Sequence, residues 1–272
     1  MADRPTDLTR VLWVGKGLGP GGMERLLVHH ANVGDRERFE YAAAYVVERP
    51  NSVIPELQAA GVAVHRLDHR LGPVDWGRSL RRLVRRERID VVHLHSPALA
   101  AVARPALRTL RRRPAVITTE HNSWDCYSWP TRIANVATYP LDDARIAVSD
   151  DAVDSVPRPL RGTSEVLVHG IDLGGARIPP EEAEVARSDV RRELGLADDA
   201  LIVLVVANHR AEKGWDVLLD AASIVAARTD DVVFLGVGHG QLEEHHRAEV
   251  ARLGLGGSVR LLGFRSDVRR LI

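Results

Sequence analysis

Short runs of β-branched and aliphatic residues alternate with longer amphipathic stretches from one end of this chain to the other. The short runs are typical of strands, and the longer stretches have the apolar spacing of helices. Strands that alternate with helices form βαβ units, in which helices cover both faces of a parallel sheet. The sequence therefore predicts an α/β protein. Its 272 residues are enough for two such domains.

The alternation falls into two parts. In the first part, strands are predicted at residues 10–15, 41–47, 62–67, 90–95, 115–119, 144–148 and 165–168, with helices at 23–33, 52–60, 76–88, 98–112 and 131–139. In the second part, strands are predicted at residues 201–207, 232–236 and 258–262, with helices at 181–194, 215–227 and 241–253. Residues 170–180, between the parts, are rich in glycine and proline, as domain boundaries often are. Because three strands are few for an open α/β sheet, the second domain is expected to be incomplete.

Composition excludes several classes of protein. With 45% hydrophobic and 27% charged residues, the chain can bury a core, which excludes a disordered or collagen-like chain. The longest apolar run, residues 201–207, is far shorter than the roughly 18 residues of a membrane span. The N-terminus has acidic residues and no apolar segment, unlike a secretory signal. Cys126 is the only cysteine, so no internal disulfide can form and the cytoplasm is the expected compartment.

The net charge is zero, but the two halves differ. Residues 1–141 hold 21 Lys+Arg and 14 Asp+Glu, a net charge of +7, and residues 142–272 hold 16 and 23, a net charge of −7. Twelve arginines lie within residues 70–113. A solvated helix face explains them most simply, and peripheral contact with the anionic inner face of a membrane is the alternative. Nucleic acid is not expected as a partner, because aromatic residues are too few and scattered for base stacking.

A glycine-rich loop follows the first predicted strand. Gly17, Gly19 and Gly22 match the pattern G-x-G-x-x-G, and Gly21 lies beside them. Glycines let the backbone turn sharply and approach a ligand, and the following helix would point its free N–H groups at an anion. On this pattern alone, a dinucleotide site with Glu48 as the ribose ligand and a tight turn without a ligand both remain open.

Three histidines lie at or just beyond the carboxyl ends of neighbouring predicted strands. His93 and His95 are two residues apart, so both point to one face of the sheet, and His121 follows the next strand. Ligands of open α/β sheets bind beyond the carboxyl ends of the strands, so these imidazoles are expected to line the ligand site. A metal site is not expected, because no spacing resembles a known zinc motif, and His93 or His95 should be a hydrogen-bonded packing residue.

The second part of the chain carries two cations in a strand-to-helix loop. Arg210 and Lys213 precede Gly214 and a predicted helix, so two positive charges and a helix N-terminus would meet at one edge of the sheet. This combination suits a diphosphate leaving group, although exposed loops often carry basic residues without a ligand. A second glycine-rich turn, which contains Gly238, follows the next strand and also allows close approach of the backbone.

Taken in order, eight segments resemble the family 4 glycosyltransferases, which are retaining enzymes of the GT-B fold. The segments are GLGPGGMER, VVHLHSPA, TTEHN, IAVSDDAV, VLVHGIDL, VANHRAEKGWDVLLDAA, FLGVGHG and VRLLGFRSDV, and they span nearly the whole chain. The resemblance implies two Rossmann-like domains: an acceptor-side domain at residues 1–171 and a partial nucleotide-sugar-binding domain at residues 172–272. It implies sugar transfer with retention of configuration from a nucleoside diphosphate sugar to a glycan, lipid or small-molecule acceptor. No metal or cofactor is implied.

The resemblance also assigns residues. It places His121 near the donor sugar, and it places Arg210 and Lys213 on the pair that stabilises the departing diphosphate. The donor-binding glycines are then expected to be Gly19, Gly21, Gly22 and Gly238.

Three features depart from the family pattern. His169 stands where an asparagine is usual, and Asn208 stands where many members have arginine. The family's pair of glutamates, eight residues apart, would begin just after Ile272. We therefore expect a truncated chain with impaired transfer. The alternatives are a nicotinamide-dependent oxidoreductase that uses the first glycine loop, and a non-catalytic fragment.

Overall fold

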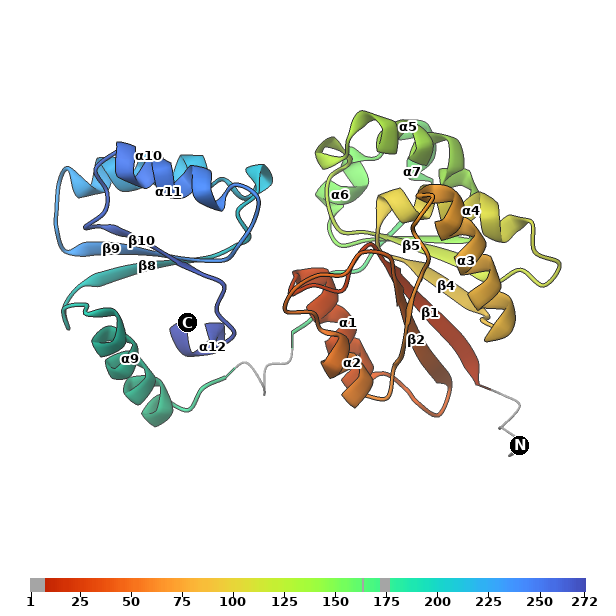
Figure 1. Cartoon of the computed structure of the whole chain (residues 1–272), viewed down its shortest axis with the longest axis horizontal. Coiled ribbons are helices and arrows are strands. Elements are labelled where there is room, and N and C mark those ends of the chain that lie inside the picture. The colour runs from red at the N-terminus through yellow and green to blue at the C-terminus, as the bar shows by residue number, and fades with distance from the viewer. Residues whose placement is uncertain (1–7, 163, 172–176) are drawn as a thin grey trace. The chain divides into compact units, whose positions relative to one another are not determined.

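The computed structural model of the chain describes residues 8–162, 164–171 and 177–272. It divides into two compact units, residues 1–171 and 172–272. Each unit is an α/β body (Figure 1). Within the described residues, no helix is long and apolar enough to cross a bilayer.

The first unit is built on a seven-stranded parallel sheet in the order β3-β2-β1-β4-β5-β6-β7. The strands are β1 (Thr9–Gly15), β2 (Phe39–Tyr45), β3 (Ala63–Arg66), β4 (Val91–Leu94), β5 (Ala115–Glu120), β6 (Ala144–Ala147) and β7 (Ser164–Val166). This order is that of a Rossmann fold, in which the chain reverses direction across the sheet between β1 and β4. The expected α/β fold is therefore confirmed.

Helices cover both faces of this sheet. They are α1 (Gly22–Val33), α2 (Ile54–Ala59), α3 (Pro73–Arg86), α4 (Pro97–Arg108), α5 (Trp129–Thr138), α6 (Asp150–Ser155) and α7 (Arg158–Arg161), with short 3-10 helices η1 (Trp124–Cys126) and η2 (Tyr139–Leu141). Side chains alternate along β1: Leu12 and Val14 pack in the core that includes α3 and α4, whereas Val11 and Trp13 pack in the core that includes α1 and α2. Burial on both faces explains the continuous apolar run of this strand.

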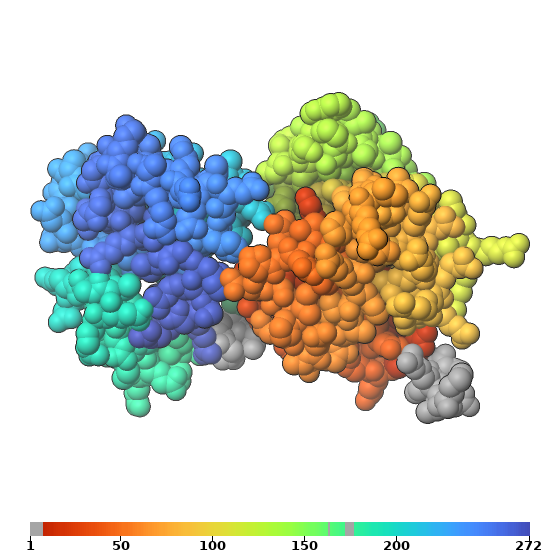
Figure 2. Space-filling view, in the orientation of Figure 1, coloured from red at the N-terminus to blue at the C-terminus, as the bar shows by residue number. Residues whose placement is uncertain are grey.

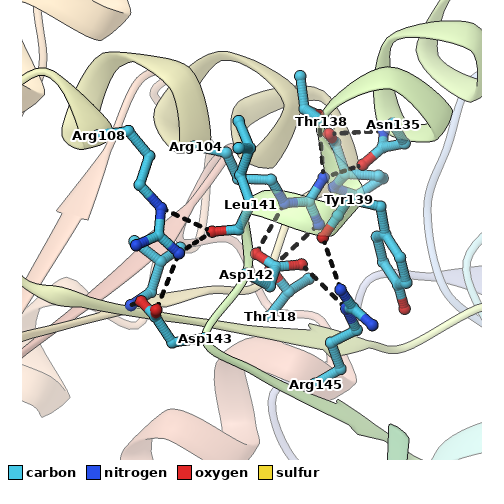
Figure 3. A network of polar contacts seen from close by, with 12 residues as sticks. Arg104, Arg108, Thr118, Asn135, Thr138, Tyr139, Leu141, Asp142, Asp143 and Arg145 are labelled. Carbon is cyan, nitrogen blue, oxygen red and sulfur yellow. Dashed lines mark hydrogen bonds and ion pairs between the residues drawn. The ribbon is translucent and has the colours of Figure 1, made fainter. Parts of the chain in front are cut away.

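A buried polar network joins α4 to the segment around η2 (Figure 3). Arg104 on α4 is fully buried and donates to Asp142 Oδ1 at 2.8 Å, Asn135 Oδ1 at 2.7 Å and Thr118 Oγ1 at 3.1 Å. Thr118 in turn donates to Asp142 Oδ1 at 2.9 Å. The Asn135 amide completes the network by donating to the carbonyl of Pro97 at 3.0 Å. Four separate elements are thereby held around one guanidinium.

The second unit contains a three-stranded parallel sheet in the order β10-β9-β8. Its elements are α9 (Pro180–Leu194), β8 (Leu201–Val206), η3 (Ala211–Lys213), α10 (Trp215–Ala226), β9 (Val232–Val237), α11 (Glu243–Arg252), β10 (Val259–Gly263) and α12 (Val268–Leu271). Leu219 of α10 and Phe234 of β9 lie in its main core. Gly236 is required by packing, since an added Cβ would lie 2.7 Å from the Trp215 ring.

Every strand and helix expected from hydrophobic period is present, with ends shifted by a few residues. The helices α6 and α7, of six and four residues, were not predicted, because they lie in no longer amphipathic stretch, whereas the six-residue helix α2 lies within the predicted stretch 52–60. The expected boundary segment, residues 170–180, lies partly outside the described residues.

Candidate functional site

The carboxyl ends of β1, β4 and β5 bring the glycine loop and the histidines to one edge of the first sheet. Val14 pairs with Leu94, and Leu94 pairs with Thr118. The backbone N–H of His95 extends the β1–β4 pairing by donating to the carbonyl of Val14 at 2.9 Å. His121 directly follows β5. This edge, beside the point where the strand order reverses, is where ligands of such sheets bind.

The predicted glycines of the first loop have different reasons to lack a side chain. A Cβ at Gly19 would lie 3.3 Å from Arg49 Cβ, so this glycine packs closely against that side chain. A Cβ at Gly21 would lie 2.4 Å from Glu24 Oε2, which places the Glu24 carboxylate beside the start of α1. A carboxylate here interacts favourably with the helix dipole. Gly22 faces open space, so of these three positions it leaves the most room for a ligand.

The histidines form a connected row. His93 Nε2 lies 2.7 Å from Thr119 Oγ1, and His95 Nδ1 lies 2.9 Å from His121 Nε2. The ring centroids of His93 and His95 are 4.1 Å apart, and those of His121 and His169 are 5.4 Å apart. The expectation that His93 or His95 is a hydrogen-bonded packing residue is confirmed. The row itself was not predicted, because sequence alone placed the rings at one edge without pairing them.

These imidazoles are uncharged at neutral pH. Burial lowers the pKa of His93 to about 3 and that of His121 to about 4, and it lowers the pKa of His95 well below the usual value. Neighbouring imidazoles lower these pKa values further, because a second positive charge beside the first is unfavourable. His121 can therefore act as a neutral hydrogen-bonding group. Within the described residues, no group of three or more His, Cys, Asp or Glu is arranged to hold a metal ion.

The free energy of unfolding should decrease as the pH falls from about 6.5 towards 4. Unfolded histidines titrate near pH 6.5, whereas the pKa values of folded His93 and His121 are about 3 and 4. Below pH 6.5 the unfolded chain binds more protons, so stability that is fully present above that pH is progressively lost. Each pKa unit corresponds to about 1.4 kcal/mol per group. Urea unfolding at pH 7 and pH 5 measures the change.

A variant with both His93→Gln and His121→Gln is the control. Burial raises the pKa of Glu120 and of Asp142. These two carboxyls therefore increase the free energy of unfolding as the pH falls, which is opposite to the effect of the histidines. Comparison with the double variant removes that contribution. If the free energy of unfolding changes equally with pH in the unmodified chain and in the variant, the assignment of neutral, buried imidazoles is contradicted.

In the second unit, the predicted cations lie on the loop between β8 and α10. Arg210 and Lys213 are both exposed, and the one ion pair that Arg210 forms with a described residue is a long contact, 3.8 Å, with Glu212. Gly214 begins α10 in the left-handed conformation, which favours glycine. The Trp215 indole donates to the carbonyl of Asn208 at 3.1 Å and so ties the loop to the helix. Both cations are available to an anionic ligand at the carboxyl edge of this sheet.

The second glycine turn packs against the cationic loop. A Cβ at Gly238 would lie 1.9 Å from the carbonyl oxygen of Ala207, and one at Gly240 would lie 2.5 Å from that of His209. Close approach of the backbone was predicted for Gly238, and the partner proves to be the neighbouring loop of this unit. Any larger residue at Gly238 would displace the loop that carries Arg210.

A pair of histidines behind this loop was missed by sequence reasoning. His209 is fully buried, and its Nδ1 lies 2.8 Å from Nδ1 of His246. The His209 ring also stacks on Trp215, with centroids 4.2 Å apart. The two histidines are 37 residues apart in sequence and show no common motif. The contacts with His246 and Trp215 hold His209 in place, and His209 immediately precedes Arg210.

Two family models match the chain. The model described as Glycosyltransferase Family 4 matches residues 20–174, and the model described as Glycosyl transferases group 1 matches residues 186–272. The first match covers more than half of the chain and most of the first unit.

Curated relatives and solved structures are similar along most of this chain. The α-D-kanosaminyltransferase of Streptomyces kanamyceticus is 26% identical over 207 residues, which are 72% of this chain and 53% of the relative. The phosphatidyl-myo-inositol mannosyltransferase of Mycobacterium tuberculosis is 27% identical over 257 residues, which are 90% of this chain and 62% of the relative. The chain thus spans between half and two thirds of the length of these relatives. The crystal structure of Anabaena HepE with UDP-glucose has a TM-score of 0.78 at 20% identity, and the match covers 96% of this chain and 71% of that one.

Proposed function

Because the chain belongs to glycosyltransferase family 4, we propose that it transfers a sugar from a nucleoside diphosphate sugar to a hydroxyl group of a glycan, lipid or small-molecule acceptor. The observation that carries this proposal is the loop with Arg210 and Lys213, where two exposed cations meet the start of α10 at a carboxyl sheet edge. Negative charge develops on the diphosphate as the sugar departs, and cations at this place stabilise it. The kinship with transferases supports the same reaction.

In this reaction the bond between the anomeric carbon and a diphosphate oxygen breaks, a bond from that carbon to the acceptor oxygen forms, and the proton of the acceptor hydroxyl passes to the departing diphosphate. We propose that the configuration is retained, as in the family that the sequence resembles. The neutral imidazole of His121 would form a hydrogen bond with the donor sugar. The glycines at 19, 21, 22 and 238 would let the backbone approach the donor. NMR of the first-formed product gives the anomeric configuration, and an inverted product would refute retention.

Thermal stability in the presence of nucleotides tests the reaction class. A ligand that binds only the folded chain raises the unfolding midpoint by mass action. We expect UDP, GDP or ADP to raise it and NAD to leave it unchanged, and a radiolabelled sugar nucleotide then gives transfer to an acceptor pool. A shift with NAD alone would favour the nicotinamide-dependent oxidoreductase.

The Arg210→Ala variant should lose the nucleotide shift, whereas Arg228→Ala, beyond the opposite end of α10, should keep it.

His121→Ala should lower the transfer rate about tenfold, since one hydrogen bond to the sugar is lost. His69→Ala, which removes an exposed histidine of the same unit, is the control.

We propose that transfer needs neither a metal nor an organic cofactor. EDTA should leave the rate of the unmodified chain unchanged. A stoichiometric zinc or iron in the purified protein, or full inhibition by EDTA, would refute this proposal.

We also propose that α3 contacts an anionic membrane surface. Leu71 and Val74 are 69% and 54% exposed at its start, and Arg78, Arg82 and Arg85 are exposed along it. The α2–α3 region, orange in Figure 2, forms part of the surface of the first unit. Exposed apolar groups flanked by arginines suit a lipid headgroup layer.

Replacement of Arg78 and Arg85 by glutamate tests this contact. Each arginine near an anionic bilayer contributes about 1 kcal/mol to binding, so the variant should cosediment far less with phosphatidylglycerol vesicles than the unmodified chain. Added salt should weaken binding of the unmodified chain. Equal binding to vesicles of phosphatidylcholine alone would show that charge does not mediate the contact.

A further inference from the structure

The hydrogen bond between His95 and His121 determines which ring nitrogen of His121 carries a proton. His95 Nδ1 and His121 Nε2 are 2.9 Å apart. Both rings are uncharged at neutral pH because burial lowers their pKa values. A neutral imidazole has one N–H donor and one acceptor nitrogen, so one of the two rings must donate and the other must accept.

The surroundings of His95 distinguish the two arrangements. Nε2 of His95 is buried and has no hydrogen-bond partner in the part of the chain that the structure describes. If His121 donated to His95, the proton of His95 would have to sit on Nε2 as a buried N–H without an acceptor. If His95 donates, Nε2 is left only as an unused acceptor. Buried N–H groups without a partner are rarer than unused acceptors, so donation from His95 is favoured.

We propose that His95 is a positioning residue that holds His121 in the tautomer protonated on Nδ1. His121 then presents an N–H donor, and the contact that it makes is with a sugar oxygen that accepts. This role rests on the proposed function, since it assigns the Nδ1–H group to the donor sugar. His121 uses Nε2 for its hydrogen bond with His95. Within the described residues, Nδ1 of His121 makes no hydrogen bond, so it is the ring atom left for a ligand.

His95 is held firmly enough to impose this choice. Its ring is 7% exposed, and its backbone N–H donates to the carbonyl of Val14 in the central strand β1. The ring of His93 lies against it at 4.1 Å between centroids, and His93 is itself bonded to Thr119. Burial and the neighbouring His93 ring restrict rotation of the His95 ring, and the tautomer of its partner is set by the hydrogen bond that His95 makes.

NMR of the unmodified chain measures the proton position directly. The protein is labelled with 15N-histidine, and long-range 1H–15N correlations distinguish protonated from unprotonated ring nitrogens. The His121 signals are identified by their loss in His121→Ala. We expect Nδ1 to be protonated and Nε2 to be unprotonated at pH 7. Protonation of Nε2 would overturn the proposal without any variant having to fold.

Variants of His95 test the positioning role. His95→Leu keeps much of the volume but removes the donor, whereas His95→Asn keeps an amide N–H near the place of Nδ1. In His95→Leu the proton of His121 should redistribute between its nitrogens, and kcat/KM for the donor should fall about tenfold with the KM for the acceptor unchanged. His95→Asn should restore both the tautomer and most of the activity. Unchanged His121 signals in folded His95→Leu would overturn the role.

A control variant and a separate assay keep the two proposals apart. Thr119→Val removes the partner of His93 with little change in volume and should leave the His121 signals as they are. If the unmodified chain transfers no sugar from UDP-, GDP- or ADP-sugars, even at the low rate expected of impaired transfer, the proposed function fails. If an active chain has His121 protonated on Nε2, the role of His95 fails alone.

Discussion

Replacing Arg210 or Lys213 with alanine is expected to lower the rate of sugar transfer about 100-fold or more. Both side chains are exposed on the loop before α10, so they can meet the diphosphate of a bound donor. Negative charge on the diphosphate grows as the sugar departs, and therefore the cations act more strongly on the transition state than on the bound donor. The loss should appear mainly in kcat, with the KM for the acceptor little changed.

The loop geometry supports a functional origin for this effect. The only ion pair of Arg210 among the described residues is its 3.8 Å contact with Glu212, and such exposed pairs contribute little to stability. Alanine variants should therefore unfold at the same urea concentration as the unmodified chain. Arg228→Ala, beyond the other end of the 12-residue helix α10, which is about 18 Å long, is the matched control for loss of a surface arginine. Full transfer by both loop variants would show that the loop has another role.

The fold was predictable because its cause is local. Runs such as residues 201–206 are apolar throughout and mostly β-branched, and alternate with helices that have one apolar stripe, so the period of each segment identifies it. The edge at which the site lies was also predictable, since parallel strands carry their loops at the carboxyl end. His95 and His121 do meet at that edge, and in the second unit the backbone at Gly238 closely approaches the loop that carries Arg210.

Pairings between distant side chains were not predictable. His209 and His246 meet only because the loop after β8 is folded against α11, and nothing in either local sequence indicates a partner. Arg104 was one of twelve arginines in a positive stretch that suggested a solvated surface, yet it is fully buried. A single sequence gives the average character of a segment. It does not reveal which arginine is matched by a carboxylate 38 residues away.

Asp142→Ala is expected to lower the free energy of unfolding of the first unit by about 3–5 kcal/mol. The side chains of Asp142 and Arg104 are both fully buried, and Asp142 Oδ1 accepts from Arg104 and Thr118. Removal of the carboxylate leaves a buried guanidinium without its counter-charge, which is far more costly than the loss of a surface ion pair. Urea unfolding of Asp142→Ala, with the exposed ion-pair variant Asp154→Ala as control, measures the difference.

The double variant Arg104→Met, Asp142→Leu separates the cost of an unpaired charge from the value of the network. Replacing both members of a buried ion pair by apolar residues is often neutral or stabilising, because two desolvated charges are removed together. Arg104 also bonds to Asn135 and Thr118, however, and these partners would stay buried without it. We therefore expect the double variant to recover part of the stability that Asp142→Ala loses. Full recovery would mean that Asn135 and Thr118 find other partners, and no recovery would mean that the hydrogen bonds of Arg104, more than its charge, hold α4 to the segment around η2.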